Sequence, residues 1–211
     1  MPANTLVLEK VVISLGGREL ARMDTAIAPG EVFTVMGPSG SGKSTLLAFV
    51  AGFLEPVFAA SGRVLCDGRD LTGLPPDRRR IGLLFQDALL FPHMSVGENL
   101  MFAMRAGGTG TARRAEAEEA LREAGLEGFF PRDPATLSGG QKARAALMRI
   151  LLSQPRALLL DEPFSRLDTG LRSQVRNFVF EEARSRKLPV LMVTHDSEDA
   201  RAAGGRVLEL G

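Results

Sequence analysis

Residues 37–45 read GPSGSGKST and match the phosphate-binding pattern G-x-x-x-x-G-K-[ST] at every specified position. Glycines allow a tight loop whose main-chain N–H groups converge on phosphate oxygens, and the helix that follows adds its positive N-terminal end. An apolar run over 31–36 precedes the loop and a helical pattern over 43–52 follows it, so we interpret the match as a nucleotide site. The residues expected to hold the nucleotide are Gly37, Pro38, Ser39, Gly40, Ser41, Gly42, Lys43, Ser44 and Thr45.

Two loop residues and two later acidic residues carry the expected chemistry. Lys43 can reach the β- and γ-phosphates of ATP, and the Ser44 hydroxyl can bind Mg²⁺. The apolar run over 157–160 is typical of a strand buried on both faces of a parallel sheet, and it ends in Asp161 and Glu162. We expect Asp161 to hold Mg²⁺ through water and Glu162 to orient the attacking water.

Strand and helix patterns alternate around these motifs, which indicates an α/β sheet with helices inserted in the middle of the chain. The strands expected from apolar runs and turn residues are 5–14, a second one ending near 28, 31–36, a strand pair within 61–70 that turns at Asp67-Gly68, 81–85, 157–160, 190–194 and 206–210. The expected helices are 43–52, 111–124, 140–153, 167–186 and 197–203, with 107–110 as a loop.

Composition excludes several kinds of partner. The net charge of +1 offers no basic excess for nucleic acid. Cys66 is the only cysteine, so it can form neither an internal disulfide nor, alone, a zinc site. No segment approaches the roughly 20 apolar residues that cross a bilayer. We therefore expect a soluble chain whose membrane role would need a partner that spans.

Residues 137–141 read LSGGQ and open a helix, which predicts a second anion site. Ser138 is a plausible N-cap, and Gly139 and Gly140 leave main-chain amides bare at the helix N-terminus. One chain with one phosphate loop has no evident use for a second phosphate site. Two chains arranged head to tail about a twofold axis would each close the other's pocket. We expect Ser138, Gly139, Gly140 and Gln141 to contact nucleotide, with Ser138 and Gly140 at the dimer interface.

In this order along the chain, the phosphate loop, LSGGQ and the Asp161-Glu162 pair resemble the ATP-binding cassette (ABC) family of ATPases. The resemblance covers nearly the whole chain. It implies an α/β P-loop NTPase core with a mainly parallel sheet, an N-terminal antiparallel β subdomain and an inserted α-helical subdomain. A single domain would span 1–211, with 1–91 and 137–211 as the core and 92–136 as the helical insertion.

The resemblance also implies roles for three further residues. Gln86, in LFQD, is similar to the glutamine that senses Mg²⁺ and the attacking water. Residues 165–168, SRLD, resemble the loop that crosses the dimer interface, which places Asp168 there. His195, in VTHD, is similar to the histidine that contacts the γ-phosphate. The expected catalytic residues are then Glu162, His195, Gln86 and Lys43, and the expected Mg²⁺ ligands are Ser44, Gln86 and Asp161.

Motif spacing favours a transporter subunit. ABC proteins of DNA repair and chromosome organisation carry long coiled coils or zinc modules between motifs, and translation factors fuse two cassettes; neither fits here. Residues 74–80 and 81–100 resemble bacterial importers of the iron, thiamine, polyamine and sugar group. The implied partners are a second copy, a transmembrane permease and an extracytoplasmic substrate-binding protein, at the cytoplasmic face of the inner membrane. An exporter motor and a soluble nucleotide-dependent switch remain alternatives.

The resemblance also implies roles in permease docking or adenine binding for four further positions. Phe91, Pro92 and Met94 are candidates for an apolar groove that receives a permease helix, although they could simply pack the insertion onto the core. Leu15 stands where the family usually stacks an aromatic ring on adenine, which predicts weaker ATP binding and poor discrimination against GTP.

The interface loop and the C-terminus depart from the family pattern. Arg166 replaces the usual small residue of the interface loop, where it could reach across the dimer or point into solvent. The sequence ends at Gly211, just after a strand, so we expect no regulation through a C-terminal domain.

Overall fold

The computed structural model describes residues 4–210, so residues 1–3 and Gly211 of the predicted domain lie outside it. The chain forms two compact units. Unit 1 contains the chain up to Leu83, residues Arg156–Glu162 and the chain from Phe180 onward. Unit 2 contains Leu84–Pro155 and Pro163–Val179. The division predicted from the sequence, with 92–136 as the insertion, stays a prediction.

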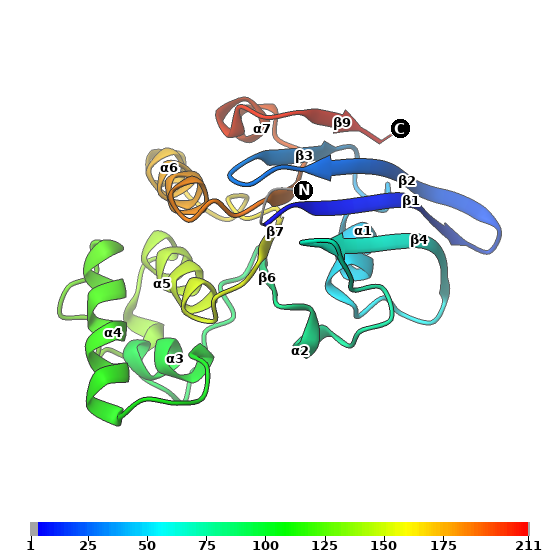
Figure 1. The fold of residues 1–211 in the computed structure, drawn as a ribbon. Coiled ribbons are helices and arrows are strands. Elements are labelled where there is room, and N and C mark those ends of the chain that lie inside the picture. Colours follow the sequence, from blue (N-terminus) through cyan, green and yellow to red (C-terminus); the bar gives the residue numbers. More distant parts are fainter. Residues whose placement is uncertain (1–3, 211) are drawn as a thin grey trace. The chain divides into compact units, whose positions relative to one another are not determined.

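The first sheet of unit 1 is antiparallel and is built by the N-terminal strands (Figure 1). Its strands, in the spatial order β2-β1-β4-β5, are β2 (Arg18–Ile27), β1 (Leu6–Leu15), β4 (Phe58–Cys66) and β5 (Arg69–Asp70). Side chains along β1 alternate between buried and less buried positions, because successive residues of a strand point to opposite faces. The predicted N-terminal antiparallel subdomain is confirmed.

The second sheet carries the ends of the predicted motifs. Its strands, in the order β6-β7-β8-β3-β9, are β6 (Ile81–Leu84), β7 (Ala157–Asp161), β8 (Val190–Thr194), β3 (Val32–Met36) and β9 (Val207–Glu209). β3 pairs in parallel with β8 and β9, and β7 pairs in parallel with β8. The carboxyl ends of β3, β7 and β8 therefore lie at one edge of the sheet, where α/β proteins bind their ligands.

The core of unit 1 joins both sheets to the helix that follows the phosphate loop. This helix, α1 (Lys43–Ala51), packs against β7 and β8, and its buried Leu46, Leu47 and Val50 share one apolar cluster with Leu8 of β1 and Leu159 of β7. Unit 1 also contains two short helices, α2 (Pro76–Arg79) and α7 (Ser197–Ala203).

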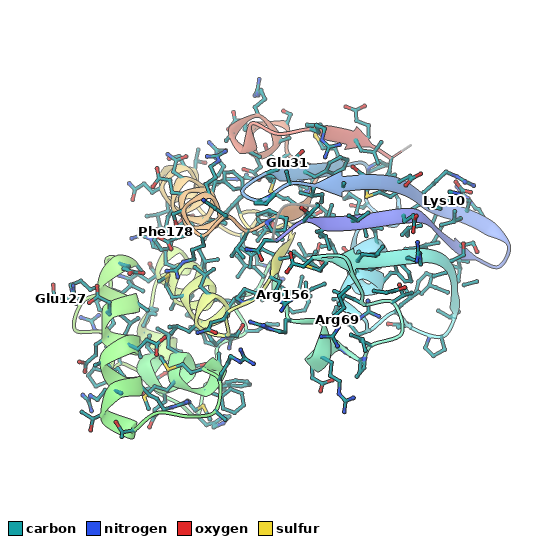
Figure 2. All side chains as sticks on the ribbon, viewed as in Figure 1. Lys10, Glu31, Arg69, Glu127, Arg156 and Phe178 are labelled. Carbon is teal, nitrogen blue, oxygen red and sulfur yellow. The ribbon has the colours of Figure 1, made fainter. Side chains whose placement is uncertain are left out.

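Glu31, labelled in Figure 2, lies just before β3 and contacts two other segments of unit 1. Its Oε2 accepts a hydrogen bond from the Ala28 amide at 2.8 Å, and its Oε1 accepts one from Arg206 Nε at 2.7 Å. Burial tends to raise the pKa of Glu31, but the hydrogen bonds and the charge of Arg206 outweigh it, so the pKa lies below its ordinary value. Arg206 also stands over the Phe33 ring, 5.0 Å from its centroid.

Unit 2 is helical. It contains α3 (Val96–Ala103), α4 (Gly110–Glu123), a 3-10 turn (Pro134–Thr136), α5 (Gly139–Leu152) and the first part of α6 (Thr169–Ser185). α3, α4 and α5 pack against one another. The helix expected from 111 begins one residue earlier, at Gly110, because Thr109 caps it by accepting a hydrogen bond from the Ala112 amide. Among residues 4–210, no helix combines the length and apolarity that a membrane span requires.

Candidate nucleotide site

The phosphate loop leaves buried strand β3 and enters α1 through glycines at which a side chain would be strained. Gly40 and Gly42 have φ angles of 82° and 88°, in the region that side chains disfavour. A Cβ atom on Gly37 would lie 2.7 Å from the Leu210 carbonyl oxygen and 2.8 Å from Ser41 Oγ. The loop backbone is therefore held close to its neighbours, as expected for a loop whose amides face a ligand.

Lys43 is nearly fully buried, with 5% of its surface exposed. Its Nζ donates hydrogen bonds to the carbonyl oxygens of Gly37 at 2.7 Å and Pro38 at 2.8 Å. Neutral carbonyls hold this ammonium, so its charge remains available to an anion bound at the loop.

Ser41 adds a second sign of a ligand site. Its Oγ is buried and has no hydrogen-bond partner within the described chain. Buried hydroxyls are normally paired, and an unpaired one needs a physical reason. A phosphate oxygen at the loop could accept its hydrogen bond, so the loop fits an anionic ligand.

The Ser44 hydroxyl meets the end of strand β7. Ser44 Oγ donates a hydrogen bond to Asp161 Oδ1 at 3.0 Å, across a sequence separation of 117 residues. Burial raises the pKa of Asp161; the neighbouring Glu162 charge acts in the same direction, whereas the Ser44 hydrogen bond and the Lys43 charge oppose it. A hydroxyl and a carboxylate are the hard oxygen ligands that Mg²⁺ prefers.

The acidic side chains do not form a cage for a metal. Among residues 4–210, no group of three or more His, Cys, Asp or Glu side chains is arranged to hold an ion.

Glu162 follows Asp161 in an uncommon backbone conformation. Its φ angle is 44°, in the left-handed region, and its amide donates a hydrogen bond to the Val193 carbonyl at 3.0 Å. Such a residue is strained by roughly 1–3 kcal/mol, and strain of this kind clusters at functional sites. The turn brings Glu162 Oε1 to 3.1 Å from Nδ1 of His195, which follows β8.

The LSGGQ segment forms a capped helix start in unit 2. The Ser138 amide donates to Gln141 Oε1 at 2.9 Å, and Ser138 Oγ accepts from the Gln141 amide at 3.3 Å. The Gln141 amide is thus used by the cap, which leaves Gly139 and Gly140 as the amide positions at the first turn. A Cβ on Gly140 would lie 3.3 Å from Val175 Cγ2, so this glycine also permits close packing on α6.

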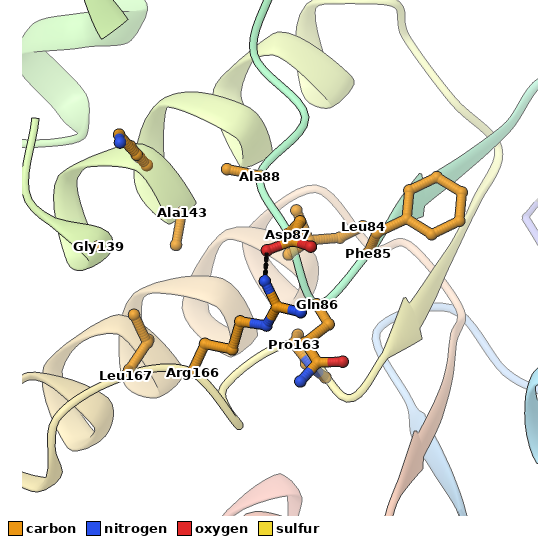
Figure 3. Close-up of a pocket in the computed structure, with 11 residues that line it drawn as sticks. Leu84, Phe85, Gln86, Asp87, Ala88, Gly139, Ala143, Pro163, Arg166 and Leu167 are labelled. Carbon is orange, nitrogen blue, oxygen red and sulfur yellow. Dashed lines mark hydrogen bonds and ion pairs between the residues drawn. The ribbon is translucent and has the colours of Figure 1, made fainter. Parts of the chain in front are cut away.

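The remaining predicted residues are at the surface. Gln86 is exposed and lines a pocket of about 180 Å³ in unit 2, together with Gly139 and Arg166 (Figure 3). Asp168 is exposed, and its carbonyl accepts hydrogen bonds at the start of α6. Leu15 is 40% exposed at the end of β1.

Unit 1 thus brings together Lys43, Ser44, Asp161, Glu162 and His195 through the contacts and charge interactions described above. Unit 2 holds Ser138, Gly139, Gly140, Gln141, Gln86 and Asp168.

Sequence reasoning missed the residues that support these motifs. Leu20 lies against Gly42, and Leu210 lies against Gly37. Phe58 is the register partner of Leu15 in strand β4. None carries a motif signal, because each is defined only by a contact with a distant segment.

Comparison with known proteins identifies the family of the chain. The profile of the family described as ABC transporter matches residues 20–165. The ABC transporter ATP-binding protein YnjD of Escherichia coli is 51% identical over 88% of this chain and 85% of its own. The thiamine import ATP-binding protein ThiQ of Cereibacter sphaeroides is 46% identical over 96% of this chain and 87% of its own. The Fe(3+) ions import ATP-binding protein FbpC of Streptomyces coelicolor is 44% identical over 99% of this chain and 60% of its own.

A solved structure agrees with the fold. The dimeric post-hydrolysis structure of the ATP-binding cassette MJ0796 with ADP and Pi superposes with a TM-score of 0.78. It is 32% identical and covers 97% of this chain and 94% of its own. The predicted α/β fold is confirmed, and the chain belongs to the ABC transporter family as one of its ATP-hydrolysing subunits.

Proposed function

We propose that this chain hydrolyses Mg-ATP to drive a bacterial importer, as one half of a twofold dimer. The observation that carries the proposal is the 3.0 Å contact between Ser44 Oγ and Asp161 Oδ1. It joins the phosphate loop to the end of β7, where the next residue is Glu162. Relatives named as thiamine and Fe(3+) importers support the direction of transport.

The nucleotide would be held by the loop from Gly37 to Thr45. Its main-chain amides and the buried Lys43 ammonium would bind the phosphates, because both present positive charge to an anion at the loop. Ser44, Asp161 and Gln86 would hold Mg²⁺, which supplies charge neutralisation on the phosphate oxygens. Leu15, exposed at the end of β1, would pack against adenine.

Glu162 would orient the attacking water and accept its proton. His195, 3.1 Å away, would fix the Glu162 carboxylate and lie near the γ-phosphate. The left-handed backbone of Glu162, with a φ of 44°, and its contact with His195 support a positioning role for the turn after β7.

A second copy would complete each site. Ser138, Gly139, Gly140 and Gln141 form a helix N-terminus, which attracts anions, and Asp168 would lie at the interface. The dimeric MJ0796 structure supports this arrangement. Hydrolysis would reopen the dimer and so move the permease.

The permease would dock on an apolar surface of unit 2. We define the docking surface as Leu89, Phe91, Pro92, Met94 and Phe102. Leu89 and Phe102 are 54% and 63% exposed. The rings of Phe91 and Phe102 meet edge to face with centroids 5.0 Å apart. Phe91 is half-buried and supports the exposed Phe102, and together they would offer an apolar contact to a permease helix.

Buried groups fix the shape of this surface. Asn99 is fully buried; its Oδ1 accepts a hydrogen bond from the Phe91 amide at 2.7 Å, and its Nδ2 donates to the Met94 carbonyl at 3.2 Å. Arg149 of α5 donates to the Leu89 carbonyl at 2.8 Å. Because α5 begins at the LSGGQ segment, a movement of the docking surface would reach the second anion site through one helix.

With these partners the chain would lie at the cytoplasmic face of the inner membrane, and an extracytoplasmic substrate-binding protein would deliver the substrate to the permease. No contact with nucleic acid is proposed, because the net charge of +1 provides no basic surface excess.

The solution mass of Glu162→Gln, measured by light scattering with and without Mg-ATP, tests the proposal. A shift from monomer to dimer on adding Mg-ATP is expected, because ATP is bound and not consumed. The matched control adds Ser138→Arg, which places a bulky cation at the second anion site and should keep the chain monomeric. If Glu162→Gln alone binds ATP but stays monomeric, the sandwiched dimer is wrong.

A further inference from the structure

Arg166 forms an ion pair with Asp87 inside unit 2 (Figure 3). Nη1 of the guanidinium donates to Oδ1 of the carboxylate. The two residues are 79 positions apart in the sequence and lie on different loops. The side chain of Arg166, left open between the partner chain and solvent by the sequence, is therefore engaged by its own chain.

The pair joins two loops that adjoin residues with proposed catalytic roles, Gln86 and Glu162. Asp87 directly follows Gln86 in the chain. Arg166 lies in the loop between Glu162 and Asp168. Gln86, Asp87 and Arg166 line the same pocket of about 180 Å³, whose other walls include Pro163. One ion pair thus connects the segment of Gln86 to the loop that follows Glu162.

The ion pair contributes little to folding. The Arg166 and Asp87 side chains are 59% and 52% exposed, and exposed pairs of this kind typically contribute about 0–1 kcal/mol. A guanidinium nevertheless presents donors in a rigid fork, so it fixes the orientation of a carboxylate more narrowly than an ammonium does. The pair is therefore better suited to orienting two loops than to stabilising the fold.

We propose that Arg166 is a positioning residue for ATP hydrolysis, which holds the Gln86 segment in place through Asp87. The proposal rests on the catalytic role proposed for Gln86. Arg166 itself touches neither nucleotide nor water in this role. Loss of the pair would let Gln86 move relative to the interface loop, which lowers the rate of the chemical step while leaving ATP binding to the phosphate loop.

The experiment measures kcat and KM for ATP hydrolysis by the purified chain, ATP affinity by equilibrium titration, and the thermal midpoint. Arg166→Ala and Asp87→Ala are each expected to lower kcat about 10-fold, a modest part of what misplacement of a catalytic group can cost. ATP affinity and the thermal midpoint should stay unchanged. The double variant should be no worse than either single variant, because both remove one interaction.

A charge-swapped variant and a matched control sharpen the test. Asp87→Arg combined with Arg166→Asp should recover part of the lost kcat, since it rebuilds the pair with the charges exchanged. Glu118→Ala breaks an ion pair of nearly equal exposure, Arg114–Glu118 at 59% and 50%, on α4 of the same unit. It should leave kcat unchanged.

Gln86→Ala distinguishes a failure of the positioning role of Arg166 from a failure of the catalytic role of Gln86. If Gln86→Ala lowers kcat and Arg166→Ala does not, the positioning role of Arg166 is wrong while the proposed function stands. If Gln86→Ala leaves kcat unchanged, the role of Gln86 falls, and with it this inference. Additive losses in the double variant, or a fall in thermal midpoint that accounts for the lost rate, would also overturn it.

Discussion

His195 Nδ1 lies 3.1 Å from Glu162 Oε1. His195 directly follows strand β8, and Glu162 directly follows strand β7. The strands are parallel neighbours, with Asp161 opposite Val193 in their register. The contact is therefore a consequence of the sheet order, which brings the carboxylate after β7 and the imidazole after β8 to the same edge of the sheet.

The first prediction concerns this pair. Glu162→Gln should lower kcat about 10²–10³-fold, because the amide cannot accept the proton of the attacking water. His195→Ala should lower kcat less, because Glu162 keeps its charge and loses only its orienting partner. ATP affinity should be retained in both. Phosphate release and equilibrium ATP binding measure the two quantities.

The other histidine provides the control for His195. His93 lies beside the Phe91 ring in unit 2, with ring centroids 5.9 Å apart. His93→Ala should leave the ATPase rate of the isolated chain unchanged. A rate for His195→Ala equal to that of the wild type would contradict the assigned role of the pair.

The second prediction is that Asp161→Asn stabilises the nucleotide-free chain while abolishing Mg²⁺-dependent hydrolysis. Burial raises the pKa of Asp161 above its ordinary value of 3.8, so the folded chain binds this proton more tightly than the unfolded chain does. Stability is therefore lost as pH rises from about 4 through the raised pKa. Asparagine carries no charge and avoids this loss.

Thermal unfolding across pH measures the effect. Asp161→Asn should raise the thermal midpoint at pH 7, because asparagine removes the charge that burial disfavours at this position. The gain should vanish below about pH 4, where the native carboxyl is protonated as well. A gain that is the same at all pH values would show that charge is not its cause.

Local motifs made much of the fold and site predictable. The run before Gly37 and the pattern after it place the phosphate loop between β3 and α1, because both signals are contained within a short window. Ser138 and Gln141, three residues apart, likewise form the cap of α5 within one short segment, so no distant contact is needed. The apolar run ending in Asp161 predicts a buried strand, since a parallel sheet is covered on both faces.

Contacts between distant segments that carry no motif could not be predicted. That Gly37 must lack a side chain depends on the Leu210 carbonyl, at the other end of the chain. The register that places Phe58 opposite Leu15 depends on an irregularity in the β1–β4 ladder between Glu9 and Val12. Neither the pattern of β1 nor that of β4 encodes it, because an extra residue in a strand shifts all later partners.

The third prediction is that Leu15→Tyr tightens ATP binding. A tyrosine at this exposed strand end would add a stacking term of about 0.5–1.5 kcal/mol, which corresponds to roughly 2–10-fold in Kd. Leu15→Met is the matched control, because it nearly conserves volume without adding a ring. Titration with ATP and GTP measures both affinity and discrimination. Equal affinities for Leu15→Tyr and Leu15→Met would contradict the adenine-packing role.

The fourth prediction concerns Arg79, a buried arginine of α2 with 5% of its surface exposed. Burial lowers its pKa, yet its donors are used by four main-chain carbonyls and by no carboxylate. The acceptors, at 2.7–2.9 Å, are those of Phe49, Val50, Thr72 and Leu74. Two of them belong to the last turn of α1, so Arg79 caps the C-terminus of the phosphate-loop helix.

Arg79→Met should lower the thermal midpoint by about 5 °C or more, because it leaves several buried carbonyls unpaired at roughly 1–3 kcal/mol each before relaxation. Arg78→Met, at the exposed neighbouring position of the same short helix, is the control and should change the midpoint little. Equal effects of the two substitutions would contradict the capping role of Arg79.

The fifth prediction tests the docking surface. Phe91→Asp would be ambiguous, because the Phe91 ring also packs under Arg149, 5.4 Å from its centroid, and its amide is bound by Asn99. Phe102→Asp is sharper, since 63% of that residue is exposed and the substitution places a charge on the surface without unpairing a buried group. The ATPase rate of the isolated chain should be unchanged.

Sedimentation of the tagged chain with membranes from its host cells measures docking. Phe102→Asp should shift the chain from the membrane pellet to the supernatant, because a carboxylate would have to lose its water against an apolar helix. Val207→Asp, at an apolar position 47% exposed on β9 in unit 1, is the control and should sediment like the wild type. Retention of Phe102→Asp in the pellet would exclude Phe102 from the contact, whereas a supernatant fraction for wild type and both variants alike would favour a soluble switch that works without a permease.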